Sequence, residues 1–359
     1  MNSTKRTRTI VGLVAVTALL SACNGTPGSV ADSIPSSIGP GTSLNTSGLA
    51  AGKQVFGSAR KPVSADGLRF DPGKTAAILY VSDGEATGAA YKMPARQHKP
   101  PFCNFQGDGL VNSIGVDADG TLWVPENGPN LKVISFAPNC GAQGVTLAPP
   151  PYYDPIGIVF GADGTKFVLM VSQSGSQIGK NGSMVSVYAN GSTSPTGQLS
   201  DRRLNYVASA VGVDSLGNVY VACCASKTRK HTHDIYVIRF KQGGSTKHGQ
   251  RILLGQLGQP AGSILFDQSG NMIVPDLLKN TVNVYAPPYS GSPTVYPLKG
   301  QPWQCAFNAN KTMLACANMT SGRVDLYSYP SLAYSYSLRK QIQSGLPPDA
   351  VAFAPAPAN

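Results

Sequence analysis

Charged residues are scarce in this sequence: Asp, Glu, Lys and Arg make up only 13% of its 359 residues. Long solvent-exposed helices are rich in Glu and Lys, so this composition does not support them. The apolar run Ile10–Leu20 is too short to span a membrane, which takes about 20 residues. The sequence therefore favours neither a helical protein nor one anchored by a membrane-spanning helix.

The sequence motifs of several catalytic classes are also missing. There is no G-x-S-x-G sequence of a nucleophile elbow and no Gly-rich phosphate loop between a strand and a helix. The only histidines are His98, His231, His233 and His248, and all are expected in loops beside basic residues. Arg and Lys do not cluster with aromatic residues, so the net charge of +11 is spread out and we expect no nucleic-acid partner.

The N-terminus carries the features of an export signal. Basic residues precede the apolar run, and the segment closes on Leu20-Ser21-Ala22-Cys23. This ending resembles the lipobox of bacterial lipoproteins, which implies acylation of Cys23 and tethering to the membrane through lipid. Asn24 is not the Asp of an inner-membrane retention signal, so the resemblance favours the outer membrane or cell surface. An ordinary cleaved signal with an incidental cysteine is the alternative.

The chain divides into three parts. Residues 1–22 are the expected signal peptide, and residues 23–72 the lipidated cysteine and a linker rich in Ser, Gly and Pro. Such a composition is typical of a flexible tether. Residues 73–359 contain the repeats described next and form the expected folded domain.

Five segments of the folded domain follow one pattern, in which two alternating apolar runs flank a polar turn. Asp-x-x-Gly is the usual turn, and glycine accepts the positive φ that such turns need. Aligned on the turn, the equivalent residues are Gly120, Gly164, Gly217, Gly270 and Lys311. A period of roughly 40–50 residues with several short strands is typical of propeller blades.

The two ends of the domain complete each other. Residues 78–94 match the second and third strands of a blade but lack the first, and residues 349–355 match a first strand. We therefore predict an all-β, six-bladed β-propeller closed by a C-terminal strand, which leaves few exposed strand edges. An open β-solenoid or a sandwich is the alternative.

The repeated unit G-[IV]-x-x-D-x-x-G-x-[LV]-[YW]-V resembles that of the NHL and gluconolactonase (regucalcin, SMP-30)-like propellers over roughly residues 75–355. The resemblance implies a six-bladed propeller and leaves function open, because this fold carries hydrolases, lyases and binding modules.

Blade alignment predicts which side chains meet at one mouth of the central channel. First-strand starts and second-strand ends supply the candidates Asp83, Glu126, Asp154, Asp276, Trp303 and Asp349. Converging carboxylates hold hard cations, so one divalent ion (Ca²⁺, Mg²⁺ or Zn²⁺) is one interpretation. The other is that these acids cap strands and bind backbone amides.

The resemblance to gluconolactonase-like propellers also implies which residues would bind a metal ion. Pro348-Asp349-Ala350 is similar to the family's Pro-Asp-Gly metal ligand, and Glu126 is a second candidate. The family's Glu-Gly-Pro and Pro-Asn-Gly segments have no counterpart here. A soft-metal site of Cys223, Cys224, His231 and His233 is a further interpretation, with disulfide pairing of the two cysteines as its alternative.

Cysteine usage fits an oxidising compartment. Apart from Cys23, six of the seven cysteines lie in the folded domain, and an even number suggests disulfides. Cys305 and Cys316 lie on one predicted hairpin. Cys103 and Cys140 would join the first two blades. Cys223 and Cys224 are left to form a disulfide with each other or with another cysteine.

These observations together predict an exported, lipid-tethered propeller that binds a protein, peptide or glycan of the cell envelope. The long loops 172–183 and 225–234 are the expected sites of specificity. The alternative function is a metal-dependent hydrolase of lactones or similar esters.

Overall fold

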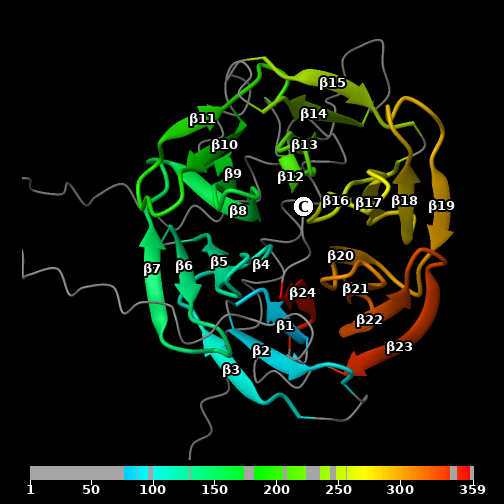
Figure 1. The fold of residues 1–359 in the computed structure, drawn as a ribbon, viewed down its shortest axis with the longest axis horizontal. Helices are drawn as coiled ribbons and strands as arrows, with labels where there is room; N and C mark the ends of the chain where they lie inside the picture. Colours follow the sequence, from blue (N-terminus) through cyan, green and yellow to red (C-terminus); the bar gives the residue numbers. More distant parts are fainter. Residues whose placement is uncertain are drawn as a thin grey trace, which may run out of the picture.

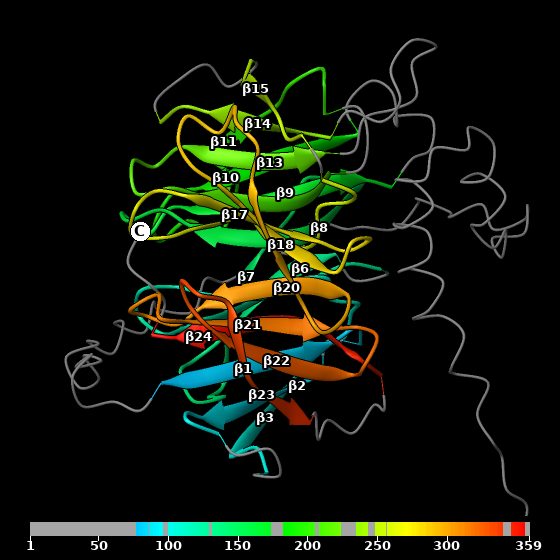
Figure 2. The same cartoon turned by 90° about the vertical axis from the view of Figure 1, so that its right-hand side faces the viewer.

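The computed structural model describes residues 77–85, 87–95, 100–128, 131–173, 182–204, 208–223, 235–242, 248–255, 257–339 and 346–355. All regular elements in these ranges are strands. They form six four-stranded antiparallel sheets around a central axis, so the predicted six-bladed β-propeller is confirmed (Figure 1). Turned on its side, the ring shows its blades stacked one above another (Figure 2).

Each blade contributes four strands, counted from the axis outward. The first strands are β24 (Pro348–Ala354), β4 (Gly115–Val116), β8 (Tyr153–Phe160), β12 (Ala208–Val213), β16 (Leu265–Phe266) and β20 (Pro302–Phe307). The second strands are β1 (Ile78–Asp83), β5 (Leu122–Glu126), β9 (Lys166–Ser172), β13 (Val219–Cys223), β17 (Met272–Asp276) and β21 (Met313–Asn318).

The blades are numbered 1 to 6 in the order in which their first strands are given above. The third and outermost strands are given in the same order of blades. The third strands are β2 (Thr87–Lys92), β6 (Lys132–Phe136), β10 (Ser183–Tyr188), β14 (Tyr236–Phe240), β18 (Thr281–Tyr285) and β22 (Arg323–Ser328). The outermost are β3 (Cys103–Gln106), β7 (Gln143–Leu147), β11 (Gly197–Leu199), β15 (Gln250–Leu253), β19 (Thr294–Pro297) and β23 (Ala333–Arg339).

The C-terminal strand closes the ring, as the sequence predicts. β24 pairs antiparallel with β1, and Ile78 opposes Ala354 at one end of the ladder while Asp83 opposes Pro348 at the other. Every residue of both strands is buried. This pairing gives blade 1 its first strand and removes the inner edge of β1 from solvent.

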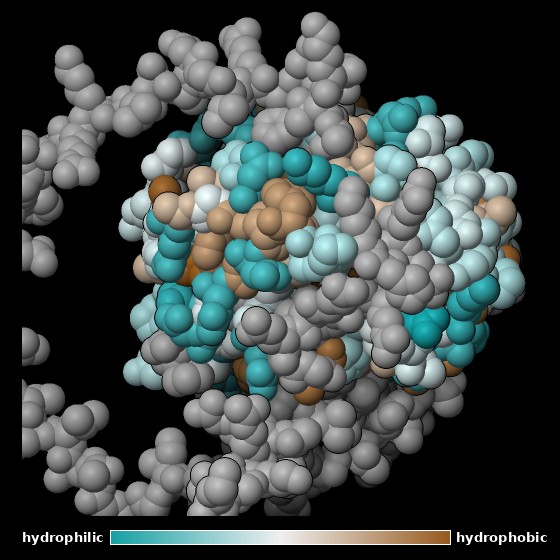
Figure 3. All heavy atoms as spheres, turned by 90° about the horizontal axis from the view of Figure 1, so that it is seen from below, coloured by the Kyte–Doolittle hydropathy of each residue, from teal (hydrophilic) through white to brown (hydrophobic). Residues whose placement is uncertain are grey.

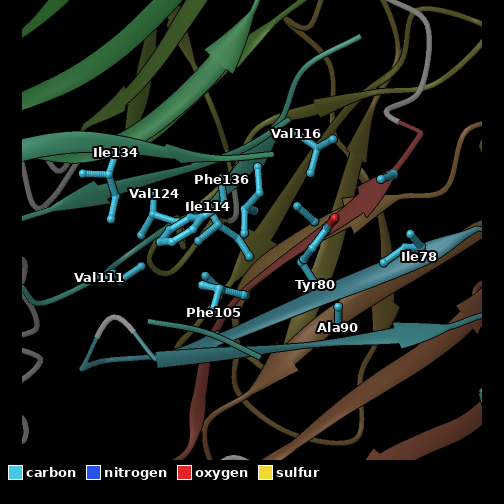
Figure 4. Close-up of a cluster of buried hydrophobic side chains, with 14 residues drawn as sticks. Ile78, Tyr80, Ala90, Phe105, Val111, Ile114, Val116, Val124, Ile134 and Phe136 are labelled. Atoms are coloured by element: carbon cyan, nitrogen blue, oxygen red, sulfur yellow. The ribbon is translucent and has the colours of Figure 1, made fainter. Parts of the chain in front are cut away.

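Side-chain alternation supplies the core. Successive residues of a strand point to opposite faces of the sheet, so each blade packs against both neighbours. The buried side chains of the described residues form an apolar cluster between each pair of adjacent blades, and blades 5 and 6 share a second, smaller one that contains Trp303. Between blades 1 and 2, Tyr80 lies edge-on to Phe105 with ring centroids 6.2 Å apart, and Phe105 packs on Phe136 at 5.6 Å (Figure 4).

The predicted turns join the first and second strands. In blade 2, Asp117 Oδ1 accepts hydrogen bonds from the N–H groups of Asp119 and Thr121, and Gly120 takes a φ of 81°. Glycine has the same left-handed conformation in blades 3, 4 and 5, whereas blade 6 places Lys311 there with φ 52°. A non-glycine residue in this conformation costs roughly 1 kcal/mol.

Two predicted disulfides are confirmed. Cys305 and Cys316 are directly opposed on the β20–β21 hairpin, with Cα atoms 4.1 Å apart. Cys103 and Cys140 join blades 1 and 2 with a Cα separation of 6.0 Å. These bonds indicate folding in an oxidising, extracytoplasmic environment.

The predicted signal peptide and the whole predicted linker, from Cys23 to residue 72, lie outside the described residues. Within the described ranges, no helix is long and apolar enough to cross a membrane. The side of the ring in Figure 3 presents mixed hydrophilic and hydrophobic side chains.

Candidate functional site

The predicted site residues belong to one face of the ring. Antiparallel pairing brings the beginning of each first strand beside the end of each second strand, as for Tyr153 with Ser172 and Ala208 with Cys223. We call this the start face. The opposite face, formed by the turns that contain Gly120, Gly164, Gly217, Gly270 and Lys311, is called the turn face.

Three of the predicted carboxylates are wholly buried on the start face, namely Asp83, Glu126 and Asp276. Asp276 Oδ1 accepts hydrogen bonds from the N–H groups of Gln259, Leu278 and Lys279 at 3.0–3.1 Å, and Oδ2 accepts one from Gly258 at 2.5 Å. Asp83 Oδ1 accepts from the Thr87 N–H and hydroxyl groups. These carboxylates fix the loops around them.

Glu126 has the same position in blade 2 and is also 0% exposed. Its Oε1 accepts the Asp108 N–H at 3.0 Å, while Oε2 lies 3.5 Å from Lys132 Nζ. Burial raises the pKa of Glu126, and the Asp108 N–H and Lys132 partly offset this rise. Lys132 also binds Asp108 at 2.6 Å, so the carboxylate belongs to a local structural network.

Sequence alignment missed a fourth member of this set. The second strand of blade 6, β21, ends at Asn318, which is not among the candidates predicted from the sequence. Asn318 Oδ1 accepts the Thr320 and Ser321 N–H groups, and Nδ2 donates to Asp325 at 2.6 Å. The equivalent residues thus share one role, which is the capture of loop amides.

A glycine lies against several of these polar residues, and it is the sequence feature from which these contacts could have been predicted. A Cβ added to Gly107 would lie 1.6 Å from Glu126 Oε1, and one on Gly300 would lie 2.4 Å from Asn318 Oδ1. A Cβ added to Gly258 would lie 2.8 Å from Asp276 Oδ1. Only glycine permits such close approach, so a glycine ahead of the first strand, as in Gly258-Gln259 of blade 5 and Gly300-Gln301 of blade 6, marks the contact in these blades.

Asp154 differs from these carboxylates because it is only partly buried. Gln173 Nε2 donates to its Oδ1 at 2.9 Å. Loss of solvent raises the pKa of Asp154 to about 6, and the Gln173 hydrogen bond opposes the rise. Asp154 is therefore the predicted acid whose charge changes under mildly acidic conditions.

The two remaining candidates are buried on the start face. Asp349 is 4% exposed, and a Cβ on Gly84 would lie 2.7 Å from its Oδ2. Trp303 is also 4% exposed and donates from Nε1 to the Asn112 carbonyl at 2.8 Å. Trp303 therefore links blades 6 and 2 rather than lining an open mouth.

The donor set does not fit a divalent cation. Among the described residues, no three His, Cys, Asp or Glu side chains come together as metal ligands. The carboxylates of Glu126 and Asp276 instead accept N–H groups of their own blades. Of the proposed soft-metal site, only Cys223 lies within the described residues; Cys224, His231 and His233 lie outside them.

Gln304 closes the channel below the start face. Its Nε2 donates to the Ile114 carbonyl at 2.8 Å, and its Oε1 accepts the N–H groups of Ile114 and Val351 at 3.1 Å. One buried side-chain amide thereby provides hydrogen-bond partners for three backbone groups on the inner edges of blades 2 and 1. On the other side of Gln304, a cavity of about 470 Å³ extends to the turn face and includes Lys311 in its lining.

No protein-family model and no curated protein matches the sequence. Solved structures similar to this chain include a nidogen/laminin complex, with a TM-score of 0.57, 14% identity and coverage of 78% of this chain and 98% of that one. Hydrazine synthase of Kuenenia stuttgartiensis gives a TM-score of 0.52, 14% identity and coverage of 76% and 85%. At these identities the similarity shows the fold alone.

The role of Asp276 can be tested by substitution. Asp276→Ala leaves four N–H groups without their acceptor and should lower the free energy of unfolding by about 3 kcal/mol in urea titrations. Asp276→Asn keeps Oδ1 and should cost clearly less. Metal content measured by mass spectrometry should be equal in wild type and both variants. Loss of a stoichiometric metal from Asp276→Ala would instead make this residue a ligand.

Asp154 should make stability depend on pH. Its pKa in the folded protein, about 6, lies above the ordinary value of 3.8, so folding favours the protonated form. The resulting stabilisation is complete below about pH 4 and is lost as the pH rises through about 6. Asp154→Asn should remove this part of the pH dependence of the urea midpoint. Identical pH profiles for wild type and Asp154→Asn would contradict the assignment.

Proposed function

We propose that this protein is an exported, lipid-tethered β-propeller whose start face binds a protein, peptide or glycan of the cell envelope. The single observation that carries the proposal is the contrast on this face between buried polar groups that hold the frame and the exposed side chains beside them.

The exposed part of the start face combines apolar and polar groups. Tyr152, just before β8, is 69% exposed, and Leu278, just after β17, is 50% exposed. The exposed Gln173 and partly buried Asp154 provide polar groups beside Tyr152. Large exposed side chains on a rigid support are typical of binding surfaces.

The longest connections between second and third strands also leave from this face. In blade 3 the chain runs from Ser172 to Ser183, and in the adjacent blade 4 from Cys223 to Tyr236, whereas blade 5 needs only Asp276 to Thr281. Long loops on a rigid scaffold commonly carry specificity. Most residues of the two long loops lie outside the described ranges.

Membrane tethering through Cys23 follows from the export signal, and the two disulfides support its extracytoplasmic direction. Two or more acyl chains give stable anchoring, whereas one gives only reversible binding. A ligand in the envelope would lie within reach of a domain held by the linker of residues 23–72.

Cys23→Ser should release the protein from the membrane. Wild type should incorporate radiolabelled palmitate in growing cells and sediment with membranes, whereas Cys23→Ser should carry no label and appear in the soluble exported fraction. Asn24→Ser leaves the acceptor thiol in place and serves as the matched control. Labelled Cys23→Ser protein would show that another residue carries the lipid.

Ligand binding can be tested with a photo-crosslinking residue. Benzoylphenylalanine in place of Tyr152 should crosslink a discrete envelope component in whole cells, because this position projects from the start face. The same residue in place of Leu216, which is 71% exposed on the turn face, is the matched control and should give no such product. Crosslinks at position 216 alone would place the interaction on the turn face and would contradict this proposal.

A further inference from the structure

The cavity beneath Gln304 is a built pocket with one closed and one open end. It has a volume of about 470 Å³ and is lined mainly by apolar residues of the six first strands. Ligand pockets commonly measure about 300–1,000 Å³ and combine an apolar lining with few polar groups. Gln304 is buried at the closed end, and the lining residues Ala118 and Ala162 are exposed at the turn face.

Lys311 is the one charged residue among the described residues of the lining. Its side chain is half-buried, and no described carboxylate lies within salt-bridge distance of it. Loss of solvent lowers the pKa of Lys311, and the charge of Asp267 acts in the opposite direction. An ammonium group in apolar surroundings without an ion-pair partner favours the approach of an anion.

Asp267 is already engaged and does not supply that anion. Its Oδ1 accepts the N–H groups of Ser269 and Asn271, and its Oδ2 accepts the Tyr329 hydroxyl at 2.6 Å and Asn271 Nδ2 at 2.8 Å. The donors on Lys311 therefore remain available to a molecule in the cavity.

The backbone gives no reason for lysine at this position. Four equivalent turns have glycine, which accepts their positive φ without strain, while Lys311 takes a φ of 52°. What blade 6 gains over the other blades is a positive charge beside the channel.

We propose that this cavity binds a small molecule with an unbranched apolar chain and a terminal carboxylate, with the chain in the channel and the carboxylate on Lys311. Two polar residues of the lining, Gln304 and Ser263, already bind Ile114 and Cys305, which favours an apolar tail over a sugar there. Lysine offers donors and no acceptor, which selects an anionic head group. The site is separate from the start face and does not depend on the function proposed for that face.

Calorimetric titration of the full chain with octanoate, decanoate and octanol tests the proposal. Octanoate should bind at least tenfold more tightly than octanol, because hydrogen bonds to a charged group contribute roughly 10- to 100-fold. Each added methylene should tighten binding by roughly fourfold until the chain reaches Gln304. Equal affinity for octanoate and octanol, or no binding of either carboxylate, would overturn the proposal.

Variants at residue 311 separate the charge from the fold. Lys311→Gly restores the residue of the other turns, so it should fold at least as stably as wild type and lose octanoate affinity by at least roughly tenfold. Lys311→Arg should retain most of the affinity. Leu253→Ala, an exposed position on β15 away from the cavity and from the start-face residues named above, should bind octanoate like wild type. Unchanged octanoate affinity in a folded Lys311→Gly protein would refute the site.

Discussion

Pairing of β24 with β1 is the interaction on which the rest of this structure depends. The seven residues Pro348–Ala354 come from the far end of the folded domain and supply the first strand of blade 1. Their alternate side chains enter two clusters: Ala350 and Ala352 pack toward blade 2, and Val351 and Phe353 toward blade 6. The same strand offers the Val351 N–H to Gln304, so ring closure also positions the group that blocks the channel.

The polar side chains of the start face explain why a face rich in acids does not resemble a metal centre. A buried carboxylate needs several hydrogen bonds to offset its lost hydration, and backbone N–H groups of nearby loops provide them for Asp83 and Asp276. Asn318 has the same role without a charge, which shows that the position requires an acceptor rather than an anion. The result is a stiff frame on which the side chains of Tyr152 and Leu278 are exposed.

Gln304 divides the channel into two environments with different chemistry. Polar and mixed groups surround the start face, whereas the space that reaches the turn face is mainly apolar and has one unpaired ammonium group among its described lining residues. A macromolecule on the loops and a small carboxylate in the channel would not compete for the same atoms. The two proposed sites are therefore independent of each other.

The sequence by itself determined the number of blades, the turn chemistry, the ring closure and two disulfides. Those features depend on local alternation, on residues such as Gly120 at positive φ, and on two complementary termini. The tertiary structure alone decided that Glu126 and Asp276 are buried against glycines, that Trp303 is a bridge, and that Lys311 lines the channel. Blade alignment identifies the end of a strand, but the partner of a side chain there depends on loops that arrive from elsewhere in the ring.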